Sequence, residues 1–145
     1  ADDDRSSVAD ITRASTMHFR DWYDLNEKRT HMRWAWHEYF KKFDVLLTPM
    51  CFTSAFPHDH IPKNAERMIS VNNEPRNYFE QVFWAGLTGV SYLPSTVIPT
   101  GLDGQGLPIG IQIVGREMGD LFTLEFADQV SREIAGLVAP VNYRD

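Results

Sequence analysis

Hydrophobic side chains recur at helical spacing through the first 43 residues of the chain. Ser6 or Ser7 can cap a first helix, and Asn26 can cap a second. The apolar stripe of the second helix consists of Met32, Trp36, Tyr39 or Phe40, and Phe43. Such a stripe faces a protein core in an amphipathic helix. The pattern therefore predicts helices over residues about 7–25 and 26–43.

Three short, mostly apolar runs in the rest of the chain have the length of buried strands. Residues 45–48 are followed by a proline, and residues 95–98 end in the same way at Pro99, which cannot donate to a central ladder. Residues 109–114 are apolar or glycine except at Gln112. Since both faces of this third strand are apolar, we expect it to lie inside the sheet.

Two amphipathic stretches predict further helices, and a long aperiodic segment precedes the first of them. Asn73 indicates the start of a helix over residues about 73–88, and Asp120 can cap a last helix over residues about 120–136. Residues 50–72 have no convincing periodicity. A loop of that length is uncommon in a compact domain and is usually a functional or covering loop.

The predicted order is helix, helix, strand, helix, strand, strand, helix, which is typical of an α/β fold with few strands. Three short strands cannot easily cover the apolar faces of four helices. We therefore interpret residues 1–145 as a single segment of a larger domain. The opening residues, Ala-Asp-Asp-Asp-Arg, lack an initiator methionine and favour the same interpretation.

Composition and charge narrow the class of protein. The 145 residues are 43% hydrophobic and include four Trp and nine Phe, so the chain can bury a core. A formal net charge of −6 disfavours nonspecific binding to nucleic acid or to an anionic membrane. The chain has no apolar run of membrane-spanning length and no basic-then-apolar leader, so we expect a soluble, cytoplasmic protein. One cysteine excludes an intrachain disulfide.

The residues that would suggest catalysis or metal binding have simpler explanations. The serine doublet near the start of the chain has no neighbouring glycines to form an oxyanion hole, and a helix cap explains it. Cys51 with His58, Asp59 and His60 has the residue types of a thiol hydrolase, but we interpret the cysteine as half-buried beside a polar loop. His58 and His60 alone make an incomplete zinc site. We predict no metal and no cofactor, and the role of the two histidines stays open.

Gln112 and the nearby glycines also have structural explanations. A lone amide in an apolar strand must be hydrogen-bonded, because an unsatisfied buried polar group costs about 1–3 kcal/mol. We expect Gln112 to bond to neighbouring backbone rather than to a substrate. Gly101, Gly104 and Gly106 connect strand to strand, whereas a phosphate-binding loop needs a helix directly after its glycines. A tight strand connection is therefore the prediction.

Several longer motifs carry the most specific information. Residues 84–101 read Trp-Ala-Gly-Leu-Thr-Gly-Val-Ser-Tyr-Leu-Pro-Ser-Thr-Val-Ile-Pro-Thr-Gly, and residues 106–116 read Gly-Leu-Pro-Ile-Gly-Ile-Gln-Ile-Val-Gly-Arg. Residues 43–49, Phe-Asp-Val-Leu-Leu-Thr-Pro, precede them, and Gly-Asp-Leu at 119–121 follows. In this order the motifs resemble the carboxy-terminal part of the amidase signature family, whose members are Ser-Ser-Lys hydrolases that cleave carboxamides. The resemblance covers most of residues 20–137.

The resemblance implies a large mixed sheet sandwiched by helices, of which this chain would supply one end. It also implies hydrolysis through a serine acyl-enzyme, in which a second serine relays the proton, a lysine is the base, and backbone amides stabilise the oxyanion. The glycine- and serine-rich nucleophile segment and its upstream lysine are absent here, so no residue of this chain is predicted to be catalytic. The expected partners are the missing amino-terminal part of the same enzyme and a small amide substrate, and a homo-oligomer is left open.

Substrate contact is expected at Met50, Cys51 and Phe52, because ligands in open α/β sheets gather beyond the carboxyl ends of strands. Together with Phe56 these side chains suit an apolar or aryl group better than a free carboxylate. Two alternatives belong to other classes. One is an A-type subunit of a glutamyl-tRNA amidotransferase, for which a strongly basic face would be expected, and the other is a non-catalytic α/β binding module.

Overall fold

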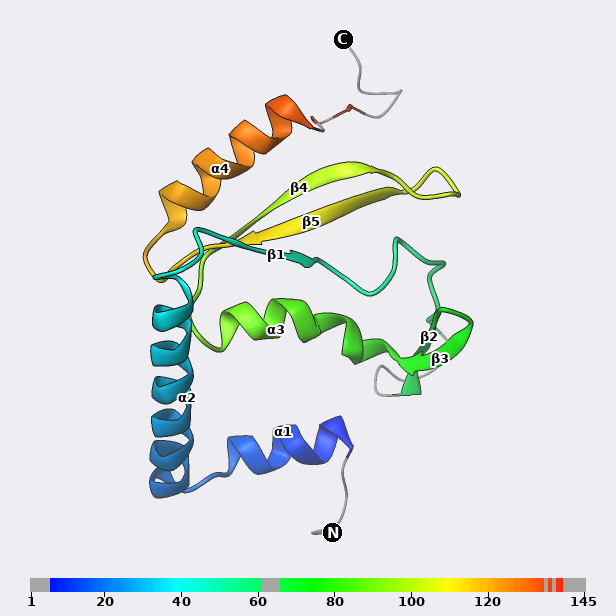
Figure 1. Ribbon diagram of the computed structural model, residues 1–145. Helices are drawn as coiled ribbons and strands as arrows, with labels where there is room; N and C mark the ends of the chain where they lie inside the picture. Colours follow the sequence, from blue (N-terminus) through cyan, green and yellow to red (C-terminus); the bar gives the residue numbers. More distant parts are fainter. Residues whose placement is uncertain (1–5, 61–65, 135, 137, 140–145) are drawn as a thin grey trace.

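The structure is a computed structural model and describes residues 6–60, 66–134, 136 and 138–139. The elements in chain order are α1 (Ser7–Ser15), α2 (Phe19–Tyr39), β1 (Leu46–Pro49), β2 (Met68–Val71), β3 (Glu74–Asn77), the 3₁₀ helix η2 (Tyr78–Val82), α3 (Phe83–Gly89), β4 (Ser95–Leu102), β5 (Pro108–Val114) and α4 (Asp120–Glu133). Helices lie around a small sheet, which agrees with the predicted α/β class (Figure 1).

The main sheet has the order β1-β5-β4, and both pairs of neighbouring strands are antiparallel. Ile113 of β5 pairs with Leu47 on one side and with Thr96 on the other. Ile113 and Val114 are fully buried. The prediction that residues 109–114 lie inside the sheet is therefore confirmed, and the apolar character of both faces of β5 explains this position.

Strand β4 is longer than the sequence predicted. It continues through Pro99 to Leu102, so the expectation that it ends at residue 98 was wrong. Pro99 pairs with Gly110, and the register shifts between Pro99 and Gly101. β4 is an edge strand of the sheet that the described residues form, where a proline is tolerated, and the bulge accommodates the irregularity. Gly101 adopts a φ of 132°, which side chains disfavour.

Helix α4 packs against the main sheet, on the side opposite α3 (Figure 1). Its buried Ala127 forms the core cluster with Ile98 and Ile113. Gly115, directly after β5, permits this close packing, because a Cβ at that position would lie 2.5 Å from Thr123 Cγ2. The core of the chain is therefore the contact between the sheet and α4.

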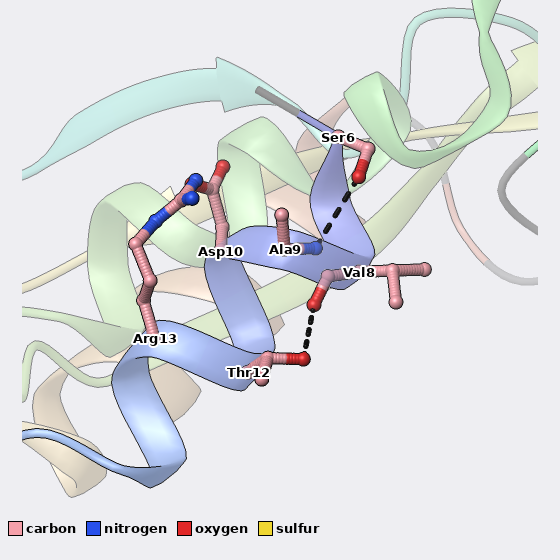
Figure 2. Close-up of polar contacts among 6 residues, drawn as sticks. All are labelled: Ser6, Val8, Ala9, Asp10, Thr12 and Arg13. Carbon is pink, nitrogen blue, oxygen red and sulfur yellow. Dashed lines mark hydrogen bonds and ion pairs between the residues drawn. The ribbon is translucent and has the colours of Figure 1, made fainter. Parts of the chain in front are cut away.

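The first helix begins as the sequence predicts but ends early. Ser6 Oγ accepts a hydrogen bond from the Ala9 amide at 3.3 Å, and Figure 2 shows this cap at the start of α1. α1 ends at Ser15, whose hydroxyl donates to the Ile11 carbonyl at 2.9 Å. Hydroxyl groups of this kind compete with the main chain for helical carbonyls. The expected helix over residues 7–25 is therefore two helices.

Helix α2 begins at Phe19 and continues without a break to Tyr39. Asn26 lies inside it rather than at its start, and its side chain accepts a hydrogen bond from Arg29 one turn later. The predicted boundary at residue 26 was wrong because the sequence signal, a polar residue that can cap, also fits a half-buried pairing within a helix. Residues 40–43 follow the end of α2.

A second, two-stranded sheet occupies the end of the predicted loop over residues 50–72 and the first residues of the predicted helix over 73–88. β2 and β3 form an antiparallel hairpin between residues 68 and 77. Asn72 and Asn73 have φ values of 52° and 66°, and positive φ at both central residues is the requirement of the favoured two-residue hairpin turn. The expected helix start at Asn73 is thus a turn. Asn77 is the actual cap, and it forms a capping box with Glu80.

The amino-terminal helices form an arm that makes few contacts with the sheet (Figure 1). Among the described residues of α2 none is buried. Arg29 and Arg33 lie over the ring of Tyr92, at 4.7 and 5.1 Å from its centroid, and Arg33 also forms an ion pair with Glu117. We call α1 and α2 together the amino-terminal arm. No helix in the described part of the chain is long and apolar enough to cross a membrane.

Candidate functional site

The chain leaves the main sheet after Pro49 and forms an irregular segment, residues 50–55, that lies opposite the start of β5. A groove of about 360 Å³ separates the two. One wall is this segment, which includes the expected contact residues Met50, Cys51 and Phe52, and the other is Pro108, Ile109 and Gly110. We call residues 50–55 the groove wall. The structure thus brings the three expected residues together on one surface.

The reason for this location differs from the expectation. The rule that ligands gather beyond the carboxyl ends of strands applies to parallel sheets, in which those ends share an edge. Here β1 is antiparallel to β5. The carboxyl end of β1 therefore lies beside the amino end of β5, and the groove forms because the chain departs from the sheet after Pro49 while β5 continues.

Asp103 joins the groove wall to the turn between β4 and β5. Its Oδ2 accepts a hydrogen bond from the Ser54 hydroxyl at 2.5 Å. Its Oδ1 accepts from the main-chain amides of Gln105 and Leu107, at 2.8 and 2.9 Å. The hydrogen bond from Ser54, and then those from Leu107 and Gln105, lower the pKa of Asp103 below its ordinary value. The turn is the tight strand connection that the glycines predicted.

Two weaker contacts hold the same segment from the other side. The Thr53 hydroxyl lies 3.5 Å from Gln81 Oε1 in η2, which is a long hydrogen bond. Further along, the ring of Phe56 meets the ring of Tyr78 edge-on, with centroids 6.0 Å apart. The groove wall and the residues after it are therefore positioned by side chains, from the β4–β5 turn on one side and from η2 on the other.

Cys51 is exposed, which corrects the interpretation of a half-buried residue. It has left the sheet and lies on an irregular segment, so neighbouring strands do not cover it. The imidazoles of His58 and His60 lie 5.5 Å apart, edge to face, in a different hollow of about 400 Å³ whose walls include Phe56 and Tyr78. The structure places Cys51 and the two histidines in separate hollows, so it does not assemble a thiol-hydrolase site.

The described residues include no group of three or more His, Cys, Asp or Glu side chains that could hold a metal ion. The rings of His58 and His60 meet edge to face, with centroids 5.5 Å apart.

Gln112 is 2% exposed and lies behind the groove, in the middle of β5. Its Nε2 donates to the Thr48 hydroxyl at 3.1 Å and, at 3.5 Å, to the main-chain carbonyl of Trp84 in α3. The expected bond to backbone is therefore present, but the shorter bond goes to a side chain on β1. These bonds connect β5 to β1 and to α3.

Ser54 and Asp103 were not among the residues that the sequence singled out. The Asp-Gly step at residues 103–104 is a turn signal, because an Asp side chain bonds to main-chain amides two or more residues on. That signal accounts for the two hydrogen bonds that Asp103 Oδ1 accepts within the turn. The contact with Ser54 spans 49 residues, and no local pattern could indicate it.

Comparison with known proteins shows the class of this chain. A sequence model of the amidase family matches residues 8–124, and the chain belongs to that family. It is similar to a fatty acid amide hydrolase of Oryza sativa subsp. indica, with 34% identity over 70% of this chain and 16% of the relative. It is also similar to the A-type subunit of a glutamyl-tRNA(Gln) amidotransferase from Rhizorhabdus wittichii, with 34% identity over 73% of this chain and 19% of the relative.

The fold agrees with this membership. A crystal structure of an amidase superposes with a TM-score of 0.67 and 16% identity, covering 86% of this chain and 27% of that one. The chain therefore has the fold of one part of an amidase signature domain. It spans less than a fifth of the length of the two sequence relatives above, 16% and 19%.

Proposed function

We propose that this chain is the carboxy-terminal part of an amidase that hydrolyses carboxamides through a serine acyl-enzyme. In this proposal the chain supplies part of the sheet and one wall of the substrate channel, and it supplies none of the catalytic groups. The observation that carries the proposal is the groove between residues 50–55 and the start of β5, in a chain of the amidase family.

The chemistry of the groove favours an apolar part of the substrate. Met50 and Phe52 are half-buried on one wall, and Pro108 and Ile109 form the other. Such surfaces gain free energy by removing apolar area from water, at about 25 cal/mol per Å². A free carboxylate placed there would lose hydration without a paired cation. We therefore propose an amide with an apolar or aryl group as the substrate.

The acyl-enzyme chemistry would come from the amino-terminal part of the same enzyme, which is also the proposed partner of this chain. The family resemblance implies two serines and a lysine there, with backbone amides for the oxyanion. The motif that the family uses for this purpose has no counterpart between residues 1 and 145. No cofactor, nucleic acid or membrane enters this proposal. A cytoplasmic location and a homo-oligomer remain predictions from the sequence.

A second candidate is an A-type subunit of a glutamyl-tRNA amidotransferase. The similarity to one such protein, at 34% identity, equals that to the fatty acid amide hydrolase. The formal charge of −6 favours the first candidate, because an enzyme acting on tRNA gains from a basic face. Transfer of ammonia to glutamyl-tRNA by the full-length protein, in the absence of aryl amide hydrolysis, would favour the second.

The test uses the full-length protein that contains this chain and a series of amides with groups of increasing bulk. Phe52→Ala should redistribute kcat/KM within the series by about tenfold or more, since losing a methylene-sized contact in an apolar pocket changes discrimination by about 1–3 kcal/mol. Val138→Ala, on an exposed residue far along the chain, is the control. The proposal is lost if Phe52→Ala and Met50→Ala both leave the profile unchanged, or if the isolated 145 residues hydrolyse the amides.

A further inference from the structure

The two walls of the groove come from parts of the chain that are distant in sequence. Ser54 on one wall and Asp103 beside the other are 49 residues apart and share a hydrogen bond. We propose that Asp103 is a positioning residue of the substrate groove, which fixes the distance of residues 50–55 from β5 through Ser54. This inference rests on the proposed function, and it assigns a role in substrate selection to a residue that lies outside the groove.

Asp103 suits this role because hydrogen bonds within its own turn orient its carboxylate independently of Ser54. The amides of Gln105 and Leu107 hold Oδ1. The main-chain amide of Asp103 donates to the Leu107 carbonyl at 2.8 Å, and its carbonyl accepts from the Gly106 amide at 3.0 Å. Oδ2 is then directed outward from a closed turn. An acceptor held in this way loses little conformational entropy when it binds a hydroxyl.

The groove wall, in contrast, has little internal support. In the described part of the chain, no main-chain hydrogen bond outside the helices and strands involves residues 51–56. The bond from Thr53 to Gln81 is at the limit of hydrogen-bond length, at 3.5 Å. Hydrogen bonds to a charged group are stronger than neutral ones. The bond between Ser54 and Asp103 is therefore the strongest polar restraint on the position of this wall.

A loosened wall would alter selection among substrates more than it alters chemistry. The width of the groove decides how well groups of different bulk fit against Phe52 and Ile109. Ser54 and Asp103 have no part in the acyl-transfer steps of the proposal. Losing their bond should thus change the ratio of kcat/KM between a bulky and a small amide more than it changes kcat for the small amide.

The experiment uses the full-length enzyme with Ser54→Ala, Asp103→Asn and the double variant. Ser54→Ala keeps both amide bonds of the β4–β5 turn, and Asp103→Asn keeps an oxygen that can accept them. Ser54→Thr retains the hydroxyl, and Ser95→Ala makes the same chemical change at an exposed position on β4.

The first readout is the ratio of kcat/KM for the two amides. The second is the rate at which iodoacetamide modifies the exposed Cys51, followed by mass spectrometry of its peptide.

Ser54→Ala should reduce discrimination about threefold or more and accelerate modification of Cys51 by a similar factor, because the charge-assisted bond is lost. Asp103→Asn should act in the same direction by a smaller factor, because its Nδ2 can still donate a neutral bond to the Ser54 hydroxyl oxygen. The double variant should be no worse than the more affected single variant, since both remove the same bond. Ser95→Ala should match the unmodified enzyme in both readouts, and Ser54→Thr, which retains the hydroxyl, should keep the slow modification of Cys51. If the enzyme is active but Ser54→Ala changes neither readout, or if the effects of the two substitutions are additive, the positioning role of Asp103 is overturned and the proposed function is not. An enzyme that hydrolyses none of the amides would instead overturn the proposed function.

Discussion

The sheet with α4 and the amino-terminal arm are built from similar residues but bury them very differently. Ile113 in β5 is fully buried, whereas Ile11 in α1 is 68% exposed. The sheet and α4 share a core cluster of Ile98, Ile113 and Ala127. The arm is held by two arginines on Tyr92 and by the ion pair between Arg33 and Glu117.

The difference shows that the apolar core of the described residues lies between the sheet and α4, and that α2 contributes no buried residue to it. Apolar burial supplies most of the free energy of folding, and exposed ion pairs supply little. The arm also exposes large apolar side chains, among them Val8, Ile11, Phe19, Trp22 and Trp34. Exposed apolar side chains favour association where they form a contiguous surface. The chain covers only 16% of the length of one relative.

Replacing the central core residue should have the largest effect. Ile113→Ala should reduce the free energy of unfolding by about 2–5 kcal/mol, because a fully buried side chain leaves a cavity. Ile11→Ala in the arm should stay within about 0.5 kcal/mol in the isolated chain, as for other exposed positions. Urea denaturation of the dilute chain measures both. Equal losses at the two positions would remove the distinction between core and arm.

The glycine after β5 offers a test of the contact between the sheet and α4. Gly115→Ala places a Cβ about 2.5 Å from Thr123 Cγ2, so the helix must shift. Overpacking of this kind costs about 1–3 kcal/mol. Gly104→Ala in the β4–β5 turn is the matched control, because nothing lies within 4 Å of its added Cβ. If both variants have the same urea midpoint, α4 does not pack as closely as the structure indicates.

The sequence predicted the core better than the periphery. The apolar faces of residues 109–114 indicated a central strand, and the turn glycines indicated its connection to β4. Both features are local consequences of burial and of backbone freedom at glycine. The family motifs lie in the same region, so the sequence could predict both the family of the protein and the central strand of its core.

The remaining differences come from contacts that local patterns do not encode. A capping residue such as Asn26 also pairs within a helix, and Asn72-Asn73 favours a hairpin turn as well as a helix start. The choice between these depends on which strand or helix packs nearby. The same limitation applies to the groove. The position of Met50 and Phe52 on an irregular segment after β1 follows from the sequence, whereas their contact with a substrate stays a prediction. The bond between Ser54 and Asp103 depends on tertiary structure.

The exposed arm should make the isolated chain associate with itself. We expect sedimentation to show oligomers or aggregates and a hydrophobic dye to bind, because the apolar surface of α1 and α2 is uncovered. Replacing Ile11 and Phe19 with lysine should reduce dye binding, whereas Thr100→Lys on exposed β4 should not. A monomeric chain that binds no dye would contradict the contrast between a buried core and an exposed arm, and it would favour a self-sufficient binding module.

The smallest expected effect is a pH dependence at the β4–β5 turn. The pKa of Asp103 is lowered in the folded chain from its ordinary value of 3.8, chiefly by the bond from Ser54. A depressed pKa means that the carboxylate stabilises the fold at pH values above 3.8, and that this contribution is lost as the pH falls through the lower folded value. The urea midpoint should therefore decrease between about pH 5 and pH 2.5 less steeply in Asp103→Asn than in the unmodified chain.

Glu38, whose pKa is lowered chiefly by its bond with Lys41, titrates in both proteins and so cancels in the comparison. Ser54→Ala should give an intermediate slope, since the bonds from Gln105 and Leu107 remain. Identical slopes in all three proteins would show that the turn and the groove wall are not joined through this carboxylate.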